Sequence, residues 1–368
     1  MSGMRADIDN LLEWAVGMGA SDLLLTHDAC PMVRVKGSLK PIEHVAPFPD
    51  STLFQLINSM LTESDQRAYE RVRQVDFSIT WRDQARVRGN AFIQRGHPAL
   101  ALRIVPDRIP TLDELGVPPQ VRELMLLPQG LVLITGPTGS GKSTTQASLI
   151  AYVVEKRSAH VLTLEDPIEY LHTHGRGLVN QREIGTDCLD FAHGLRAALR
   201  ESPDVLLVGE MRDPESIGIT LSVAETGHLV VSTLHTNDTA SALDRIVDVF
   251  PAERQEQVRV QLAGSLVAVV AQRLVPRIEG GMVAAWEVLI ANHAIRNLIR
   301  EGKTRQIRNA ITMGQNDGMF TLEQSLSSLV RHGIVTHADA VARSVIPTEV
   351  ESQFTGPHTV CPWQRRRS

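Results

Sequence analysis

LVLITGPTGSGKST, residues 131–144, decides the fold of this 368-residue chain. The apolar, β-branched run LVLIT predicts a short buried strand, and the run TTQASLIAYVV that follows Ser143 predicts a helix. Between them, GPTGSGKS (136–143) matches the pattern GxxxxGK[ST]. In this pattern glycines let backbone N–H groups surround phosphate oxygens at a helix N-terminus, a lysine reaches the terminal phosphates and a hydroxyl ligates Mg²⁺. The stretch therefore predicts a strand–loop–helix unit that binds nucleotide phosphates with Mg²⁺. The alternative is a glycine-rich turn without function, which the full match in this context disfavours.

The predicted phosphate-binding residues share this one loop and the start of its helix. They are Gly136, Pro137, Thr138, Gly139, Ser140, Gly141, Lys142, Ser143 and Thr144, with Ser143 as the magnesium ligand.

Around the loop, short apolar runs of strand length alternate with helical patterns. The other runs are HVLTL (160–164), DVLLVG (204–209) and HLVVSTL (228–234). This alternation predicts an α/β domain with a mostly parallel sheet that is covered on both faces. From about residue 252 the pattern is helical, and LAGSLVAVVA (262–271) is expected to be a core helix, too short to span a membrane.

The rest of the chain divides by composition. Residues 1–106 combine a first helix with short alternating runs such as MVRVKG and VDFSITW, which predicts a smaller α+β domain. The Pro-rich stretch 107–120 is expected to be a linker, residues 121–347 the nucleotide-binding domain, and residues 348–368 a mobile tail.

Acidic residues follow two of the predicted strands. Glu210 ends DVLLVGE, and Glu165 and Asp166 end HVLTLED. Since the carboxyl ends of parallel strands meet at the ligand-binding edge of a sheet, Glu210 can polarise an attacking water, and Glu165 and Asp166 can lie beside Mg²⁺. The alternatives are an exposed glutamate and, for LEDP, an Asp-Pro turn with solvated acids.

Two histidines bracket the run LVVSTL. His235 follows its carboxyl end and could contact the terminal phosphate, whereas His228 stands a strand's length away at the other end. For either residue alone, a structural hydrogen bond is the alternative.

Composition limits the possible partners. The net charge is −5 and aromatic residues make up 4% of the chain, so neither a basic stripe nor a stacking surface for nucleic acid is evident. The N-terminal segment carries Asp7, Asp9 and Glu13 where a secretory signal would be apolar, which indicates a cytoplasmic protein.

Taken together, these motifs resemble the secretion-ATPase superfamily, the ring-shaped motors of type II secretion and type IV pili. GPTGSGKS resembles its Walker A motif, LEDPIEY its Asp box, LLVGEMRD its atypical Walker B motif and TGHLVVSTLHTN its His box. The strings NQREIG (180–185), DRIVDVFP (244–251) and AIRNLIRE (294–301) are most similar to the PilT family of pilus retraction ATPases. The resemblance runs from residue 19 to about residue 345.

This resemblance implies a RecA-like ATPase domain preceded by a PAS-like domain, a homohexamer, and ATP hydrolysis coupled to domain motion that retracts type IV pili in twitching motility. It also implies that Arg88 and Arg103 approach the nucleotide phosphates, and that the motor docks on a platform protein at the cytoplasmic face of the inner membrane. A paralogous retraction ATPase is a further expected partner.

AIRNLIRE gives the finer expectation. By its period alone it is an amphipathic helix packed through its apolar side. In the family this string accompanies retraction, so Arg296, Asn297, Arg300 and Glu301 become candidates for coupling hydrolysis to a partner. The absence of any CxxC pair and the short N-terminal region differ from pilus-extension ATPases. The alternatives are an accessory retraction ATPase of the PilU type, a pilus-assembly or secretion ATPase, a nucleic-acid motor, and a nucleotide-switched binding module.

Overall fold

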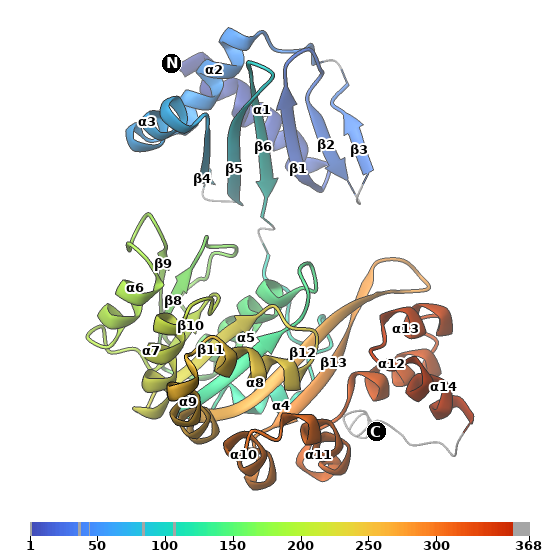
Figure 1. Ribbon diagram of the computed structural model, residues 1–368. Coiled ribbons are helices and arrows are strands. Elements are labelled where there is room, and N and C mark those ends of the chain that lie inside the picture. Colours follow the sequence, from blue (N-terminus) through green and yellow to red (C-terminus); the bar gives the residue numbers. More distant parts are fainter. Residues whose placement is uncertain (1, 36–37, 44, 83–84, 106–107, 356–368) are drawn as a thin grey trace. The chain divides into compact units, whose positions relative to one another are not determined.

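The computed structural model describes the chain except residues 1, 36–37, 44, 83–84, 106–107 and 356–368. It divides into two compact units (Figure 1). The first comprises Met1–Arg108 with Glu169–Leu171, and the second comprises Ile109–Ile168 with His172–Ser368. Each unit has its own sheet and its own core.

The first unit is built on an antiparallel sheet. Among the described residues it has six strands in the order β3-β2-β1-β6-β5-β4. Its elements are α1 (Ser2–Gly17), β1 (Ala20–Thr26), β2 (Met32–Val35), β3 (Ser38–Pro41), α2 (Asp50–Met60), α3 (Glu63–Val72), β4 (Gln74–Trp81), β5 (Ala85–Gln94) and β6 (His97–Ile104). Leu12 of α1 and Leu56 of α2 are fully buried in one core with Leu23 and Leu102 of the sheet. This is the small α+β domain expected from the sequence.

The second unit carries a mostly parallel sheet in the order β13-β12-β7-β11-β10-β8-β9, with only β13 antiparallel to its neighbour among the described strands. Its strands are β7 (Gly130–Thr135), β8 (His160–Glu165), β9 (Leu178–Glu183), β10 (Val205–Val208), β11 (Leu229–Leu234), β12 (Leu266–Pro276) and β13 (Met282–Ile290). Its helices are α4 (Pro119–Leu124), α5 (Lys142–Lys156), α6 (Phe191–Ala198), α7 (Pro214–Glu225), α8 (Thr239–Asp248), α9 (Ala252–Ser265), α10 (His293–Arg300), α11 (Ile307–Met313), α12 (Leu322–Arg331), α13 (His337–Arg343) and α14 (Pro347–Thr355).

Helices cover both faces of this sheet. Leu131 and Leu133 of β7 face one core, with α6 to α11, whereas Val132 and Ile134 face the other, with α4 and α5. Successive strand residues point to opposite faces, so a strand buried on both must be apolar throughout. This accounts for the uninterrupted apolar run LVLI, and the expected α/β fold is present.

The expected core helix at LAGSLVAVVA (262–271) is wrong in its second half. Helix α9 ends at Ser265 and the chain continues directly into β12. There Val269 pairs with Leu133 and Val270 with Ile134 in parallel register with β7. This β-branched run is buried on both faces, and it pairs its backbone hydrogen-bonding groups by lying between β7 and β13. The region after residue 252 is therefore helical only outside β12 and β13.

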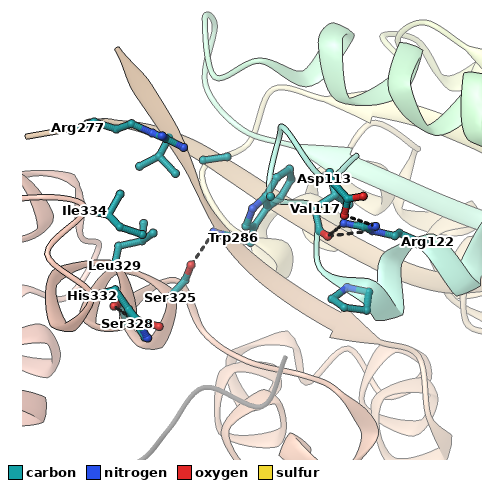
Figure 2. Close-up of a pocket in the computed structure, with 14 residues that line it drawn as sticks. Asp113, Val117, Arg122, Arg277, Trp286, Ser325, Ser328, Leu329, His332 and Ile334 are labelled. Carbon is teal, nitrogen blue, oxygen red and sulfur yellow. Dashed lines mark hydrogen bonds and ion pairs between the residues drawn. The ribbon is translucent and has the colours of Figure 1, made fainter. Parts of the chain in front are cut away.

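The stretch expected as a linker, 107–120, is for its described part packed onto the second unit. Leu112 and Val117 are buried in the same core as Trp286 of β13. Arg122 fixes the segment with an ion pair to Asp113 (2.7 Å) and hydrogen bonds to the carbonyl of Val117 (Figure 2). A cavity of about 680 Å³ lies between this segment, β13 and α12.

The first part of the stretch expected to be a mobile tail, 348–368, is helical. Residues up to Thr355 belong to α14, which lies with α12 and α13 beside β13 (Figure 1). Val350 is fully buried, and Glu349 accepts a hydrogen bond from Arg308 at 2.7 Å. The remaining tail, 356–368, lies outside the described residues.

Candidate nucleotide site

The phosphate loop connects the carboxyl end of β7 to the first residue of α5, Lys142. Gly136, Gly139 and Gly141 have φ values of +151°, +76° and +89°, a region that side chains with a Cβ rarely adopt. Pro137, Thr138 and Gly139 are exposed, whereas Ser140 and Lys142 are buried and Ser143 and Thr144 are half-buried. The loop thus presents an accessible turn at a helix N-terminus, which is the arrangement that binds anions.

Gln272 of β12 supports this loop from behind, and the sequence interpretation missed it. A Cβ at Gly136 would lie 2.4 Å from the carbonyl oxygen of Gln272, and one at Gly141 would lie 3.0 Å from its Nε2. The Oε1 atom of Gln272 accepts a hydrogen bond from the Thr145 hydroxyl of α5 at 2.8 Å, and both residues are buried. The signal in the sequence is that the polar residue Gln272 follows the apolar run 262–271. This pattern is compatible with the end of a helix, which was the expectation, and with a strand, which is what the structure has.

Lys142, His235 and Glu210 form a chain at the carboxyl ends of β7, β11 and β10. The Nζ atom of Lys142 donates to the carbonyls of Gly136 (2.8 Å) and Pro137 (3.1 Å) and lies 3.4 Å from Nδ1 of His235. The Nε2 atom of His235 lies 3.4 Å from Oε1 of Glu210. Burial, and then the positive charge of Lys142, lower the pKa of His235 below its usual value. A neutral imidazole protonated at Nε2 suits both neighbours, since its Nδ1 can accept from the lysine while Nε2–H faces the carboxylate.

Glu210 itself is held by its surroundings. Arg212 contacts its Oε2 atom through Nε at 2.7 Å and Nη2 at 2.6 Å. The preceding Gly209 donates its N–H to Leu164 at 2.8 Å and accepts from the hydroxyl of Thr233 at 2.5 Å. These contacts tie the end of β10 to both neighbouring strands, so Glu210 leaves the sheet from a fixed position with Oε1 turned toward His235.

The two acidic residues after β8 have different surroundings. Glu165 accepts hydrogen bonds from the hydroxyl of Thr163 (2.6 Å) and from Nε2 of Gln181 (3.0 Å), whereas Asp166 is exposed. Glu165 is therefore anchored within its own edge of the sheet, and Asp166 is the more accessible carboxylate.

The remaining candidates lie elsewhere. His228 precedes β11 at the opposite end from His235, where its Nδ1 lies 3.3 Å from the carbonyl of Val223. His228 is therefore not part of the contacts among Lys142, His235 and Glu210. Its contact with the carbonyl of Val223 is the structural role given above as the alternative.

Arg88 and Arg103 belong to the first unit. They are directly opposite each other on β5 and β6. Arg88 contacts Glu169 at 3.1 Å, a residue of the same compact unit, and Arg103 contacts Asp22 at 3.2 Å. The two guanidinium groups therefore occupy one face of this sheet.

The candidates for coupling lie on and just after α10, and they are not equivalent. Ile295 and Ile299 are buried as the period predicts, but Ala294, placed on the same apolar face, is exposed. Arg296 binds the carbonyls of Ala291, Ala263 and Gly264 and so caps the end of α9. Arg300 and Glu301 are exposed, with Arg300 bonded to Asn297 at 2.6 Å and Glu301 paired with Lys303 at 2.7 Å. Arg296 thus faces the fold, and the outward part of the set is Asn297, Arg300 and Glu301.

Comparisons with known proteins identify the family of the chain. The family described as "Type II/IV secretion system protein" matches residues 7–315. The type IV pilus retraction ATPase PilT of Pseudomonas aeruginosa is 44% identical over 93% of this chain and 99% of its own, and a twitching motility protein of Neisseria gonorrhoeae is 47% identical over 85% and 84%.

A solved structure has the same architecture. The crystal structure of the pilus retraction motor PilT with bound ADP superimposes with a TM-score of 0.88 at 47% identity, covering 94% of this chain and 99% of that one. No helix in the described part of the chain is long and apolar enough to cross a membrane. The chain binds nucleotide and belongs to the type II/IV secretion system protein family, within which it is an ATP-hydrolysing retraction ATPase of the PilT type.

Proposed function

We propose that this chain hydrolyses ATP with Glu210 as the general base and that the hydrolysis powers retraction of type IV pili, and so twitching motility. The observation that carries the proposal is the chain of contacts from Lys142 through His235 to Glu210. It links a phosphate-binding lysine to a carboxylate that can orient an attacking water. His235, which lies near both residues, would then respond to a terminal phosphate bound between Lys142 and Glu210.

The residues present also fit a magnesium ion. Mg²⁺ prefers oxygen ligands, and the half-buried hydroxyl of Ser143 and the exposed carboxylate of Asp166 offer them after the carboxyl ends of β7 and β8, two strands of the same parallel sheet. When bound, the ion would neutralise charge on the phosphates. Glu165, already engaged by two hydrogen bonds, would instead position the strand end.

Assembly and location form the next part of the proposal. We infer a homohexamer in which Arg88 and Arg103 stabilise charge on the phosphates, so that hydrolysis is coupled to movement of the N-terminal domain, 1–106, against the ATPase domain, 121–347. The motor would dock from the cytoplasm on a pilus platform protein of the inner membrane, with a paralogous retraction ATPase as a further partner. This part of the proposal rests on the resemblance of the sequence motifs to PilT-type motors.

The test of the catalytic assignment is Glu210→Gln. Loss of a general base lowers turnover by about 10²–10⁴-fold, and the amide keeps the size of the side chain, so ADP affinity should stay within about twofold. Steady-state phosphate release and titration with fluorescent ADP measure the two quantities. Glu215→Gln is the matched control, because Glu215 is an exposed glutamate of α7 paired with Arg196. Turnover that survives Glu210→Gln rejects Glu210 as the base.

The test of the cellular role is deletion of the chain from its own cells, with complementation by wild type or by Glu210→Gln. Non-motile cells with excess pili support retraction, whereas cells without pili would indicate an assembly ATPase. Motile cells after deletion would indicate an accessory role.

A further inference from the structure

Two histidines and an aspartate from separate segments converge in the first unit, away from every residue assigned above. His27 lies in the turn after β1, Asp50 is the first residue of α2, and His97 is the first residue of β6. The antiparallel pairing of β1 and β6 brings the turn and the start of β6 to the same end of the sheet (Figure 1). The fold itself therefore assembles the cluster.

The geometry of the cluster is specific. Nδ1 of His27 lies 2.7 Å from one oxygen of Asp50, and Nδ1 of His97 lies 2.6 Å from the other. The two rings are stacked, with centroids 3.7 Å apart and planes inclined by 7°. Each imidazole thus directs its Nδ1 atom to the carboxylate of Asp50. The side chains are 30–38% exposed, so an ion can reach them from solvent.

A second carboxylate completes the pattern around His27. Its other ring nitrogen, Nε2, lies 3.0 Å from Oδ2 of Asp28. Histidines that ligate metals commonly bond their second nitrogen to a carboxylate, which fixes the ring and makes the ligating nitrogen more basic. Asp28 has a φ of +56°, a left-handed conformation that is uncommon outside glycine.

We propose that His27, Asp50 and His97 bind a divalent transition-metal ion of the Zn²⁺ type. Two imidazoles and one carboxylate suit zinc and its neighbours, whereas Mg²⁺ and Ca²⁺ prefer sites made of oxygen. The three ligand atoms lie within 4.8 Å of one another. Metal–ligand bonds of about 2.0–2.1 Å place tetrahedral ligands about 3.3 Å apart. The hydrogen-bonded nitrogens and oxygens, 2.7 and 2.6 Å apart, therefore need to separate by about 0.6–0.7 Å to admit the ion, and the two stacked rings must also tilt so that both Nδ1 lone pairs point at it. The bound ion would join the turn after β1, the start of α2 and the start of β6.

The experiment is isothermal titration of the full chain, free of nucleotide and chelators, with Zn²⁺ alone. We expect a saturable site of one ion per chain that is distinct from weaker binding elsewhere. His97→Ala and Asp50→Asn should each weaken that site by at least about tenfold, and Asp28→Asn should weaken it by about tenfold through His27.

His193→Ala is the matched control, because His193 is also exposed and bonded to one aspartate, Asp190, at 2.8 Å, but in the second unit. Its zinc isotherm should equal that of wild type. Absence of a saturable site, or a site unchanged by His97→Ala and Asp50→Asn, overturns the proposal and leaves a hydrogen-bonded cluster.

If a variant loses its fold by circular dichroism, the visible spectrum of the wild-type chain with Co²⁺ decides. Intense bands of a tetrahedral ion with nitrogen ligands support the site, and the pale spectrum of hydrated Co²⁺ overturns it. Neither readout depends on ATP hydrolysis.

Discussion

Replacement of Gln272 by alanine tests whether β12 shapes the phosphate loop. Gln272 is 3% exposed, and its amide accepts a hydrogen bond from Thr145, which is fully buried. Its carbonyl oxygen and amide also lie directly behind Gly136 and Gly141. Alanine keeps the main-chain carbonyl and removes the side chain beyond Cβ, so the change isolates the side-chain contacts of one residue.

The magnitude follows from these contacts. The Thr145 hydroxyl loses its partner in a place that water does not reach, which costs about 1–3 kcal/mol of unfolding free energy. The same hydroxyl lies in the first turn of α5, the helix whose N-terminus forms the phosphate site. We expect ADP affinity to fall by about tenfold, which corresponds to about 1.4 kcal/mol, because the loop must then be ordered on binding.

Urea unfolding and titration with fluorescent ADP measure the two effects. A double-mutant cycle of Gln272→Ala with Thr145→Ala should give a coupling of about 0.5–1.5 kcal/mol. Gln261→Ala is the control, since the side-chain amide of Gln261 donates at the surface to Glu225 and the change leaves its main-chain carbonyl in place. Unchanged ADP affinity in Gln272→Ala, with stability reduced, would refute a role for β12 in shaping the loop.

Four other substitutions test single contacts. Gly209→Ala places a Cβ 3.1 Å from a main-chain carbonyl, which must displace the end of β10, so turnover in a phosphate-release assay should fall while the fold by circular dichroism persists. Arg308→Met leaves Glu323, which is fully buried, without its ion-pair partner at 2.7 Å, and should lower the unfolding free energy by about 3–5 kcal/mol in urea. Burial raises the pKa of Glu323, but hydrogen bonds and the charge of Arg308 outweigh burial and lower the pKa overall. The stability that this ion pair contributes is therefore present above the unfolded pKa of about 4.3 and is lost as pH falls through the lower folded pKa. Acid unfolding of wild type and of Arg308→Met compares the two pH dependences. Arg300→Ala should keep ATP turnover and impair retraction. Arg296→Ala should lower thermal stability, which melting curves of the two variants would show.

The grouping of Lys142, Glu210 and His235 was predictable from the sequence because these residues follow strand ends. Lys142, Glu210 and His235 are far apart along the chain, yet each follows a short apolar run, and parallel strands bring such positions to one edge. Helix α7 begins where its local sequence favours a start, since the side chain of Asp213 accepts from the N–H of Ser216 at 2.9 Å just before Pro214. Local chemistry and topology agree at these positions.

The role of β12 was not predictable in the same way. An apolar run of this length is compatible with a buried helix or with a strand buried on both faces, and periodicity does not separate them. What decides is pairing with β7, more than 100 residues away in the chain. The same applies to Gln181, whose bond to Glu165 depends on β9 lying beside β8. The hydrogen bonds that hold the site residues thus come from tertiary neighbours, which local sequence patterns do not predict.

The position of Arg296 gives the string AIRNLIRE a more definite physical role than an exposed partner surface. Its guanidinium binds the last carbonyls of α9, a favourable place for a cation because the helix dipole is negative there. Helix α9 runs without a loop into β12, and β12 carries Gln272 against the phosphate loop. We therefore expect a shift of α10 to reach the phosphate loop through α9 and β12, whereas Arg300 is exposed on α10. Comparison of Arg296→Ala with Arg300→Ala separates the two routes, because only the first should change ADP affinity.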